Sequence, residues 1–248
     1  MQTTNLDLFI RDFNKVRDMG FTESRRSNST GIGKTFEDLI GVAENNAKEA
    51  DLHGFEIKSQ RNLSGSYVTL FTKSPTLPKS ANTHLRMSYG SFDSEHPDVK
   101  VLHTSIFHGR YNTHTAGAKF SLRVNRQESK LYVLVQHDDG TIDDSVYYSF
   151  DNIKNALAKI ENLAFVSADT RRNAEGKEEF NFTSAIIYYD FISFENFLDL
   201  VEEGVIMYDV RIGAYKMGAN RGKTHDHGSG FRIKKNDMQR LYRKSLKI

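Results

Sequence analysis

The sequence predicts a mixed α/β fold in which helices and strands follow one another along a chain of 248 residues. Three observations support this prediction. Several segments carry apolar residues at helical spacing, whereas others are short runs of β-branched and aromatic residues bounded by turn residues. Both kinds occur throughout the chain, and its length is enough for one large domain or two lobes. We therefore expect a mixed sheet with packed helices and a second lobe.

Two helices are predicted in the first fifty residues. Residues 4–18 have their apolar side chains, from Leu6 to Val16, at the spacing of one helix face. After a polar loop, residues 35–46 show the same pattern, and Thr35 is the expected N-cap because its side chain can accept a hydrogen bond from a first-turn amide. The second helix leads directly into a strand.

The remaining elements are predicted from the same two periodicities and from turn residues. Residues 51–58 and 67–73 are expected to pair as a hairpin, and the polar segment 79–98 is expected to form an irregular loop or a short helix. Further along, we expect a hairpin of 119–125 with 130–137, a helix over 151–163, strands at 164–170 and 180–190, a helix over 193–204 that ends at Gly204, and strands at 205–215 and 229–235.

Composition excludes several classes of protein. The chain has no cysteine, which excludes disulfides and thiolate metal sites and fits a reducing compartment. No apolar run approaches the roughly 20 residues of a membrane-spanning helix, and the first residues lack the pattern of a signal peptide. We therefore expect a cytoplasmic protein with no membrane partner.

Charge is distributed unevenly along the chain. Residues 211–248 hold 11 Lys and Arg against 2 Asp and Glu, whereas residues 1–210 hold 23 against 30. A basic block on an acidic body favours a polyanionic partner, because basic side chains displace counterions from phosphates. A solvated basic tail is the alternative, but apolar residues such as Phe231 and Leu241 indicate that this block is folded.

The most informative segment is DLHGFEIK, which runs from Asp51 to Lys58. Side chains two apart in a strand point to the same face, so Glu56 and Lys58 should lie side by side, and a turn at Gly54 can bring Asp51 toward them. Two carboxylates, helped by the Ile57 carbonyl, could hold Mg²⁺ at a phosphodiester, and the lysine could orient or deprotonate the attacking water. The alternative is a solvated charge pair at a strand end.

Glu37 is a further candidate for this site. It lies on the polar side of the helix that precedes the strand, where it could act as a third acid or remain solvated. The neighbouring Gly33-Lys34-Thr35 does not form a nucleotide-binding loop, because Asn28 stands where that motif needs a glycine. A helix followed by strands with acidic ends is typical of a nuclease-like α/β core.

A second group of polar residues lies near the C-terminus, in the segment THDHG. His225, Asp226 and His227 lack the further ligands of a closed zinc site. They lie near Arg211, Lys223 and Arg232, and this mixture of types is suited to reading DNA: arginine pairs with guanine, histidine with base edges or phosphates, and aspartate with cytosine.

Together these motifs resemble the MvaI/BcnI family of type II restriction endonucleases, which is related to the MutH mismatch-repair nicking enzyme. MvaI-like members are the nearer relatives, although the segment 216–220 departs from them and leaves its contacts open. The resemblance covers essentially the full length. It rests on TGIGKTFEDL, DLHGFEIK, LFTKSPT, ANTHLRMSYG, SVYYSFD and, most specifically, RIGAYKMGANRGKTHDHGSGFRI.

The resemblance implies a PD-(D/E)xK nuclease core and a second lobe that reads DNA. Residues 1–100 would form a mainly catalytic lobe, and residues 101–248 a strand-rich lobe that completes the core and carries the recognition region, with interleaving allowed. Asp51, Glu56 and Lys58 would be catalytic, with Glu37 in support. Base contacts would come from Asp209, Arg211, Tyr215, His225 and Arg232, and a minor-groove probe from Asn82, His84 and Arg86.

The implied activity is restriction of double-stranded DNA by a monomer that cuts one strand at a time. The implied target is CC-N-GG, with A or T at the centre for MvaI-like members and C or G for BcnI-like ones. Mg²⁺ is the expected cofactor, Mn²⁺ is expected to substitute, and Ca²⁺ is expected to support binding without cleavage. A cognate DNA methyltransferase is a further candidate partner. The alternatives are a MutH-like nicking enzyme and a DNA-binding module without activity.

Overall fold

The computed structural model describes residues 4–26, 30–41, 52–62, 65, 67–113 and 117–248. The chain forms two compact units, described separately here. Unit 1 comprises Met1–Ser66, Ala158–Ile192 and Met238–Ile248, and unit 2 comprises Tyr67–Leu157 and Ser193–Asp237. The division expected near residue 100 differs from this one, because the strand that begins at Tyr67 pairs inside unit 2.

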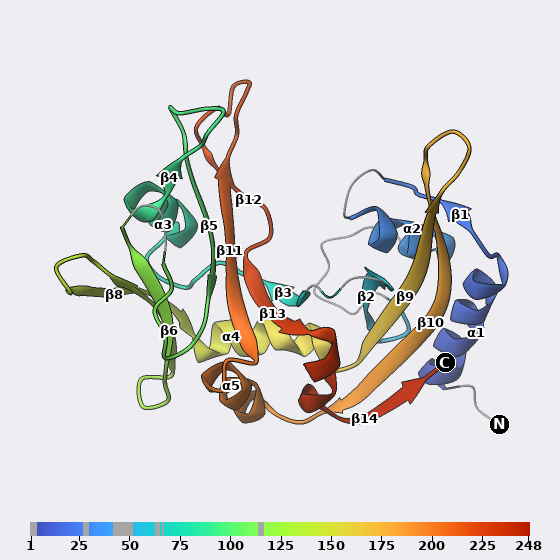
Figure 1. Ribbon diagram of the computed structural model, residues 1–248. Coiled ribbons are helices and arrows are strands. Elements are labelled where there is room, and N and C mark those ends of the chain that lie inside the picture. The colour runs from blue at the N-terminus through green and yellow to red at the C-terminus, as the bar shows by residue number, and fades with distance from the viewer. Residues whose placement is uncertain (1–3, 27–29, 42–51, 63–64, 66, 114–116) are drawn as a thin grey trace. The chain divides into compact units, whose positions relative to one another are not determined.

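Unit 1 is a mixed sheet with two helices (Figure 1). Its strands follow the order β1-β10-β9-β2, and β14 also pairs with β10. Among the described strands of this sheet, only β2 runs parallel to its neighbour, with Glu56 opposite Leu163 on β9. The elements are α1 (Asn5–Asp18), β1 (Thr22–Glu23), α2 (Gly31–Leu39), β2 (Glu56–Arg61), a 3-10 helix (Ala158–Ile160), β9 (Leu163–Arg172), β10 (Glu178–Phe191) and β14 (Tyr242–Lys247).

The first predicted helix is confirmed. Thr4 caps α1: its hydroxyl accepts a hydrogen bond from the Asp7 amide at 3.2 Å, and its own amide donates to the Asp7 carboxylate at 2.9 Å. The apolar face of α1 packs with α2, β2, β9 and β10 in one core, which includes Phe9, Phe13, Phe36, Ile57 and Phe182. This core fixes β2 from one side.

The start of the second helix differs from the prediction. Helix α2 begins at Gly31, and Thr35 is buried inside it rather than at its N-cap. The Thr35 hydroxyl donates to the Gly31 carbonyl at 2.7 Å and accepts from the Arg25 amide at 2.9 Å. Thr35 therefore joins α2 to the preceding loop. The end of the predicted helix, residues 42–46, lies outside the described residues.

The predicted hairpin of the first two strands is wrong. Strand β2 pairs with β9, whereas β3 (Tyr67–Thr72) pairs with β13 in unit 2. Each strand pairs with a segment that lies far away in the sequence. The local pattern of apolar residues does not indicate which distant segment that is. The predicted hairpin of β6 with β7 is confirmed, and β9 and β10, which were predicted as strands, pair with each other in antiparallel fashion.

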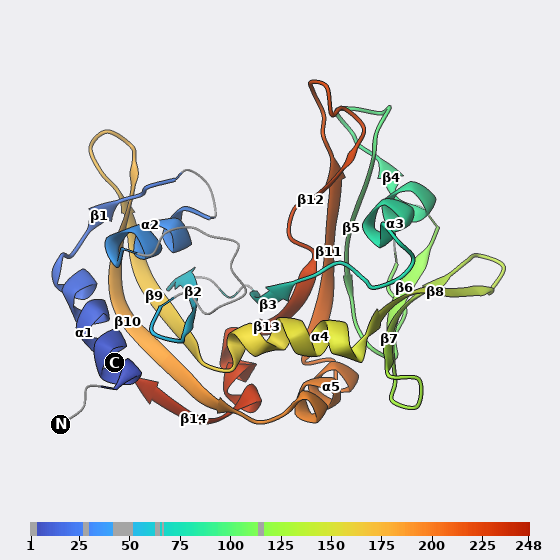
Figure 2. The ribbon, with the colours of Figure 1, turned by 180° about the vertical axis from the view of Figure 1, so that it is seen from behind.

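Unit 2 has two sheets, of order β3-β13-β11-β5-β4 with β12 on β11, and of order β6-β7-β8. Figure 2 shows α4 and α5 near the ends of these strands. The elements are β3, α3 (Ala81–Tyr89), β4 (Ser91–Phe92), β5 (Lys100–Ile106), β6 (Lys119–Asn125), β7 (Lys130–Gln136), β8 (Ile142–Ser149), α4 (Phe150–Leu157), α5 (Phe194–Glu202), β11 (Ile206–Ala214), β12 (Thr224–Asp226) and β13 (Gly230–Lys234), and a 3-10 helix over Lys235–Leu241 continues into unit 1.

Most elements predicted in this part of the chain are present. Helix α3 lies within the segment expected to be a loop or short helix, and α5 is capped by Ser193 and followed by Gly204 at a φ of 73°. The helix predicted over 151–163 is shorter, because it ends at Leu157 and gives way to a 3-10 turn and then β9. In the part of the chain that the structure describes, no helix is long and apolar enough to cross a bilayer.

Candidate active site and nucleic-acid interface

Strand β2 presents an acid and an amine side by side. The Lys58 ammonium donates to Glu56 Oε1 at 2.6 Å, as the two-residue period of a strand predicts. Between them, the Ile57 side chain points into the core of unit 1 and is only 5% exposed. The core therefore fixes the face on which Glu56 and Lys58 stand.

The second oxygen of Glu56 is unusual. The residue is buried, and Oε2 has no hydrogen-bond partner among the described residues. The Lys159 ammonium, from the 3-10 helix before β9, lies 3.8 Å from this oxygen. An unsatisfied buried carboxylate oxygen is costly, and a cation is the group that relieves it. The donor set thus fits a hard divalent metal, and Lys159 is a neighbour that motif spacing did not reveal.

A tight turn precedes Glu56. His53 and Gly54 have φ values of 49° and 79°, and the amide and carbonyl groups of Leu52 and Phe55 exchange hydrogen bonds of 2.8 and 3.1 Å. His53 Nε2 also lies 2.9 Å from Asp12 Oδ2. The expected turn at Gly54 is therefore present and anchored to α1.

Two further acids, Asp51 and Glu37, were predicted for this site. Asp51 lies outside the described residues. Glu37 is half-buried in α2, the helix that packs against β2. Among the described residues, no group of three or more His, Cys, Asp or Glu side chains could hold a metal.

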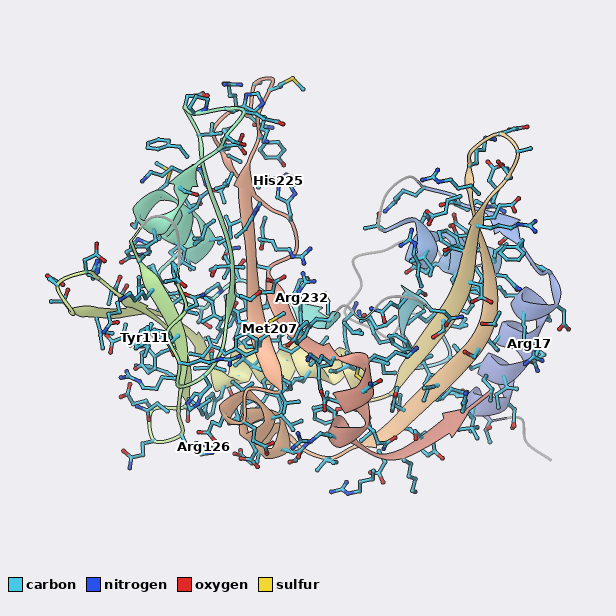
Figure 3. The ribbon with its side chains drawn as sticks, in the orientation of Figure 1. Arg17, Tyr111, Arg126, Met207, His225 and Arg232 are labelled. Carbon is cyan, nitrogen blue, oxygen red and sulfur yellow. The ribbon has the colours of Figure 1, made fainter. Side chains whose placement is uncertain are left out.

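In unit 2, one side of the sheet around β11 is polar. The even residues of β11, from Ile206 to Ala214, are buried, whereas the odd residues lie on the opposite side. Figure 3 shows Met207, Arg232 and His225 along this side. We call this surface the polar face, and its members are His103, Ser105, Asp209, Arg211, Tyr215, His225, His227 and Arg232.

Asp209 organises the lower part of the polar face. Its Oδ2 accepts from Arg211 Nε at 2.6 Å and lies 3.0 Å from Arg232 Nε, and its Oδ1 accepts from the Ser105 hydroxyl at 3.0 Å. Arg232 also donates to the Gly228 carbonyl at 3.1 Å. One buried carboxylate thus holds two guanidinium groups, and the Arg211 side chain remains 51% exposed.

Aromatic rings form the upper part of the polar face. Tyr215 stacks on His225 with centroids 4.5 Å apart, and His227 meets His225 edge-on at the same distance. His227 lies over Gly213, where an added Cβ would come within 2.6 Å of Nε2. Burial, and then the charge of His225, lower the pKa of His227.

A groove of about 680 Å³ lies on this face. Its lining includes Asp209, Arg211 and His227, together with His103 and Ser105 of β5. The last two were not predicted from the sequence. The signal that could have found them is their register, because His103 lies opposite Arg211, and Ser105 opposite Asp209, on an antiparallel neighbour.

Asp226 and Lys223 lie beside this face without joining it. Asp226 Oδ1 accepts from the Gly228 amide and from both the amide and hydroxyl of Ser229, at 2.7 to 3.1 Å, and its Oδ2 accepts from Asn82 Nδ2 at 2.9 Å. Its carboxylate therefore shapes the loop into β13, and the base contact of Asp226 stays a prediction. Lys223 is exposed and donates to Asn220 at 3.0 Å.

The predicted minor-groove probe is not an exposed loop. Asn82, His84 and Arg86 lie in α3, and Asn82 and Arg86 are buried. All three guanidinium nitrogens of Arg86 donate to neighbouring segments, and the His84 ring packs edge-on against Tyr89. The polar atoms of Asn82 and Arg86 serve the packing of α3 in this structure, and a contact of these residues with the minor groove stays a prediction.

Comparisons with known proteins agree with this arrangement. The model of the MvaI/BcnI restriction endonuclease family matches residues 10–242. The chain is similar to the solved structure of restriction endonuclease MvaI in complex with cognate DNA, at 34% identity and a TM-score of 0.88 with 99% of each chain covered. It is also similar to MvaI in the absence of DNA, at 34% identity and a TM-score of 0.63, with 100% and 99% covered. A search of curated proteins found no match.

The histidine stack predicts a measurable coupling. The pKa of His227 in the folded protein should lie below the ordinary value of histidine. The unfolded chain therefore binds this proton at a higher pH than the folded chain does, and the fold loses stability as the pH falls from the ordinary pKa to the lowered one. Replacing His225→Gln removes a repulsive positive charge and should raise the pKa of His227. NMR titration of the imidazole signals measures the pKa of His227. His137→Gln is the control, and it should leave that pKa unchanged. An unaltered His227 titration in His225→Gln would contradict the coupling.

Proposed function

Because the chain belongs to the MvaI/BcnI restriction endonuclease family and is therefore a type II restriction endonuclease, we propose that it cuts double-stranded DNA at CC-N-GG, with A or T preferred at the centre. One observation carries the catalytic part of this proposal: Glu56 is buried with one oxygen on Lys58 and the other without a hydrogen-bond partner among the described residues. A polar face with two arginines carries the recognition part.

Asp51, Glu56 and the main-chain carbonyl of Ile57 would hold a Mg²⁺ ion. When bound, this ion supplies a Lewis acid that polarises the phosphate and acidifies water. Lys58 orients the attacking water by hydrogen bonding, in line with the leaving oxygen, and Glu37 assists as an acceptor for water. Mn²⁺ should replace Mg²⁺, and Ca²⁺ should support binding without cleavage.

The polar face reads bases in the major groove. A β-ribbon fits this groove, and arginine donates two parallel hydrogen bonds to guanine O6 and N7. Arg211 and Arg232 match the guanines of the target, and Asp209 keeps both guanidinium groups oriented. His225 and Tyr215 add contacts to base edges, with His227 beside them. Lys223 contributes attraction to phosphates.

The enzyme acts as a monomer with a single active site. A cognate DNA methyltransferase that modifies the same site is the expected companion, because unmodified host DNA would be cut.

Digestion of DNA of known sequence tests the proposed specificity. Purified protein with Mg²⁺ should produce fragments whose sequenced ends all map to CCWGG, where W is A or T. Fragments with ends at other sites would overturn the proposed target. A requirement for an added activating protein would favour a MutH-like nicking enzyme instead.

Substitutions should separate catalysis from recognition. Lys58→Ala should abolish cleavage while binding to a CCAGG duplex in Ca²⁺ is retained, because the lysine acts on water. Arg232→Ala should weaken that binding by about 1–3 kcal/mol, the usual contribution of a bidentate arginine to guanine. Fluorescence anisotropy and gel assays measure the two effects. Equal loss of binding in both variants would contradict this division.

A single active site predicts a nicked intermediate. On supercoiled plasmid with one site, open-circular DNA should accumulate before the linear form, and the initial rate should rise in proportion to enzyme concentration. Agarose gels of a time course measure both. Rates that grow with the square of enzyme concentration, with no open-circular species, would show that the monomer proposal is wrong.

A further inference from the structure

Strand β12 has two sides with different partners. His225 points to the polar face and stacks on Tyr215. Its neighbours Thr224 and Asp226 point the other way, toward α3, where their side chains are bonded. The alternation of the strand therefore places His225 on the polar face and its two neighbours in contact with α3 on the opposite side.

Three side chains on one side of α3 make these contacts. Asn82 Nδ2 donates to Asp226 Oδ2 at 2.9 Å, and the Thr83 hydroxyl donates to the Thr224 hydroxyl at 2.9 Å. Arg86, one turn further along, donates from Nε to the same Thr224 hydroxyl at 3.2 Å. Residues three and four apart lie next to one another on a helix, so the contacts form one patch.

Arg86 extends this patch to two further segments. Its Nη2 donates to the Gly222 carbonyl at 2.8 Å, and its Nη1 donates to the Lys100 carbonyl at 2.9 Å, at the start of β5. The residue is only 3% exposed. A planar guanidinium can reach three separated acceptors at once, which the single ammonium of lysine cannot do.

The turn between β11 and β12 also makes two ion pairs with the segment between β4 and β5. Lys216 lies 3.1 Å from Asp93, and Arg221 donates to both oxygens of Asp98 at 2.8 to 3.1 Å. The Arg221–Asp98 pair is exposed and contributes little, whereas the Lys216–Asp93 pair is partly buried. The hydrogen bonds of Arg86 are buried, and they connect Gly222 at the end of this turn and Thr224 of β12 to the start of β5.

We propose that Arg86 is a positioning residue for base recognition. It holds the β11–β12 hairpin in the position in which Tyr215 and His225 can contact the base edges. This inference rests on the proposed function. It assigns to α3 a role in specificity without contact to DNA: a displaced hairpin would still attract phosphates but would no longer match base edges.

Two variants and one control test this inference. Arg86→Met removes all three hydrogen bonds and keeps apolar volume, and Thr224→Val removes the shared hydroxyl with little change in shape. Arg126→Met is the matched control, because Arg126 pairs with Asp199 and Glu202 on α5 in the same unit and does not touch the polar face. Each protein is titrated in Ca²⁺ against a CCAGG duplex and a duplex with one outer base pair changed, and its thermal unfolding is recorded.

The expected result is a loss of discrimination. In Arg86→Met the ratio of the two affinities should fall by roughly tenfold, the size of a misplaced base contact, whereas affinity for the altered duplex stays within about twofold because phosphate attraction remains. In Thr224→Val the ratio of the two affinities should fall by less than in Arg86→Met. Arg126→Met should keep the wild-type ratio even if it unfolds at a lower temperature.

The outcomes separate this inference from the proposed function. A wild-type ratio in folded Arg86→Met, or an equal loss of affinity for both duplexes, would overturn the positioning role and leave the proposed function standing. Absence of discrimination in the wild-type protein would overturn both. If Arg86→Met does not fold, Thr224→Val decides: an unchanged ratio there overturns the inference, and a reduced ratio at unchanged unfolding temperature supports it.

Discussion

The alternation of side chains along β11 between the core and the opposite side of the sheet is the constraint on which the polar face depends. Its even residues, among them Tyr208 and Val210, are fully buried in unit 2. Because side chains alternate between the two sides of a strand, burial of the even residues places Asp209 and Arg211 on the polar face. A slip of one residue would move both charges into the core, so the hydrophobic packing fixes the register of the side chains on the polar face.

The same constraint acts on β2 in unit 1, with a different result. Ile57 fills the core, and Glu56 and Lys58 therefore share the other side of the strand. Here the carboxylate is buried, and one oxygen is left without a hydrogen bond among the described residues. Such a group costs stability, and the aromatic core behind β2 offsets that cost. The Lys58 and Lys159 ammonium groups lie 2.6 and 3.8 Å from the two carboxylate oxygens of this site.

Local features were predictable from the sequence, and distant pairings were not. Helix α1 and the pairing of Glu56 with Lys58 follow from the spacing of side chains, and the turn at Gly54 follows from the residue type. The parallel pairing of β2 with β9 depends on contacts between segments that are distant in the sequence. A single sequence does not reveal these contacts, and therefore it does not reveal that Lys159 lies near Glu56. Arg86 shows a different difficulty, because a charged residue gives the same pattern whether it faces DNA or supports the fold.

The interleaving of the two units has a consequence for how such an enzyme can change its target. The chain passes between the units four times, so neither one is a contiguous stretch that could be exchanged by fusing ends. A new specificity must arise by substitution within the polar face, or by simultaneous replacement of two internal segments whose ends fit the same scaffold. Shuffling of whole modules, a common route for proteins whose domains lie in tandem, is closed to this architecture.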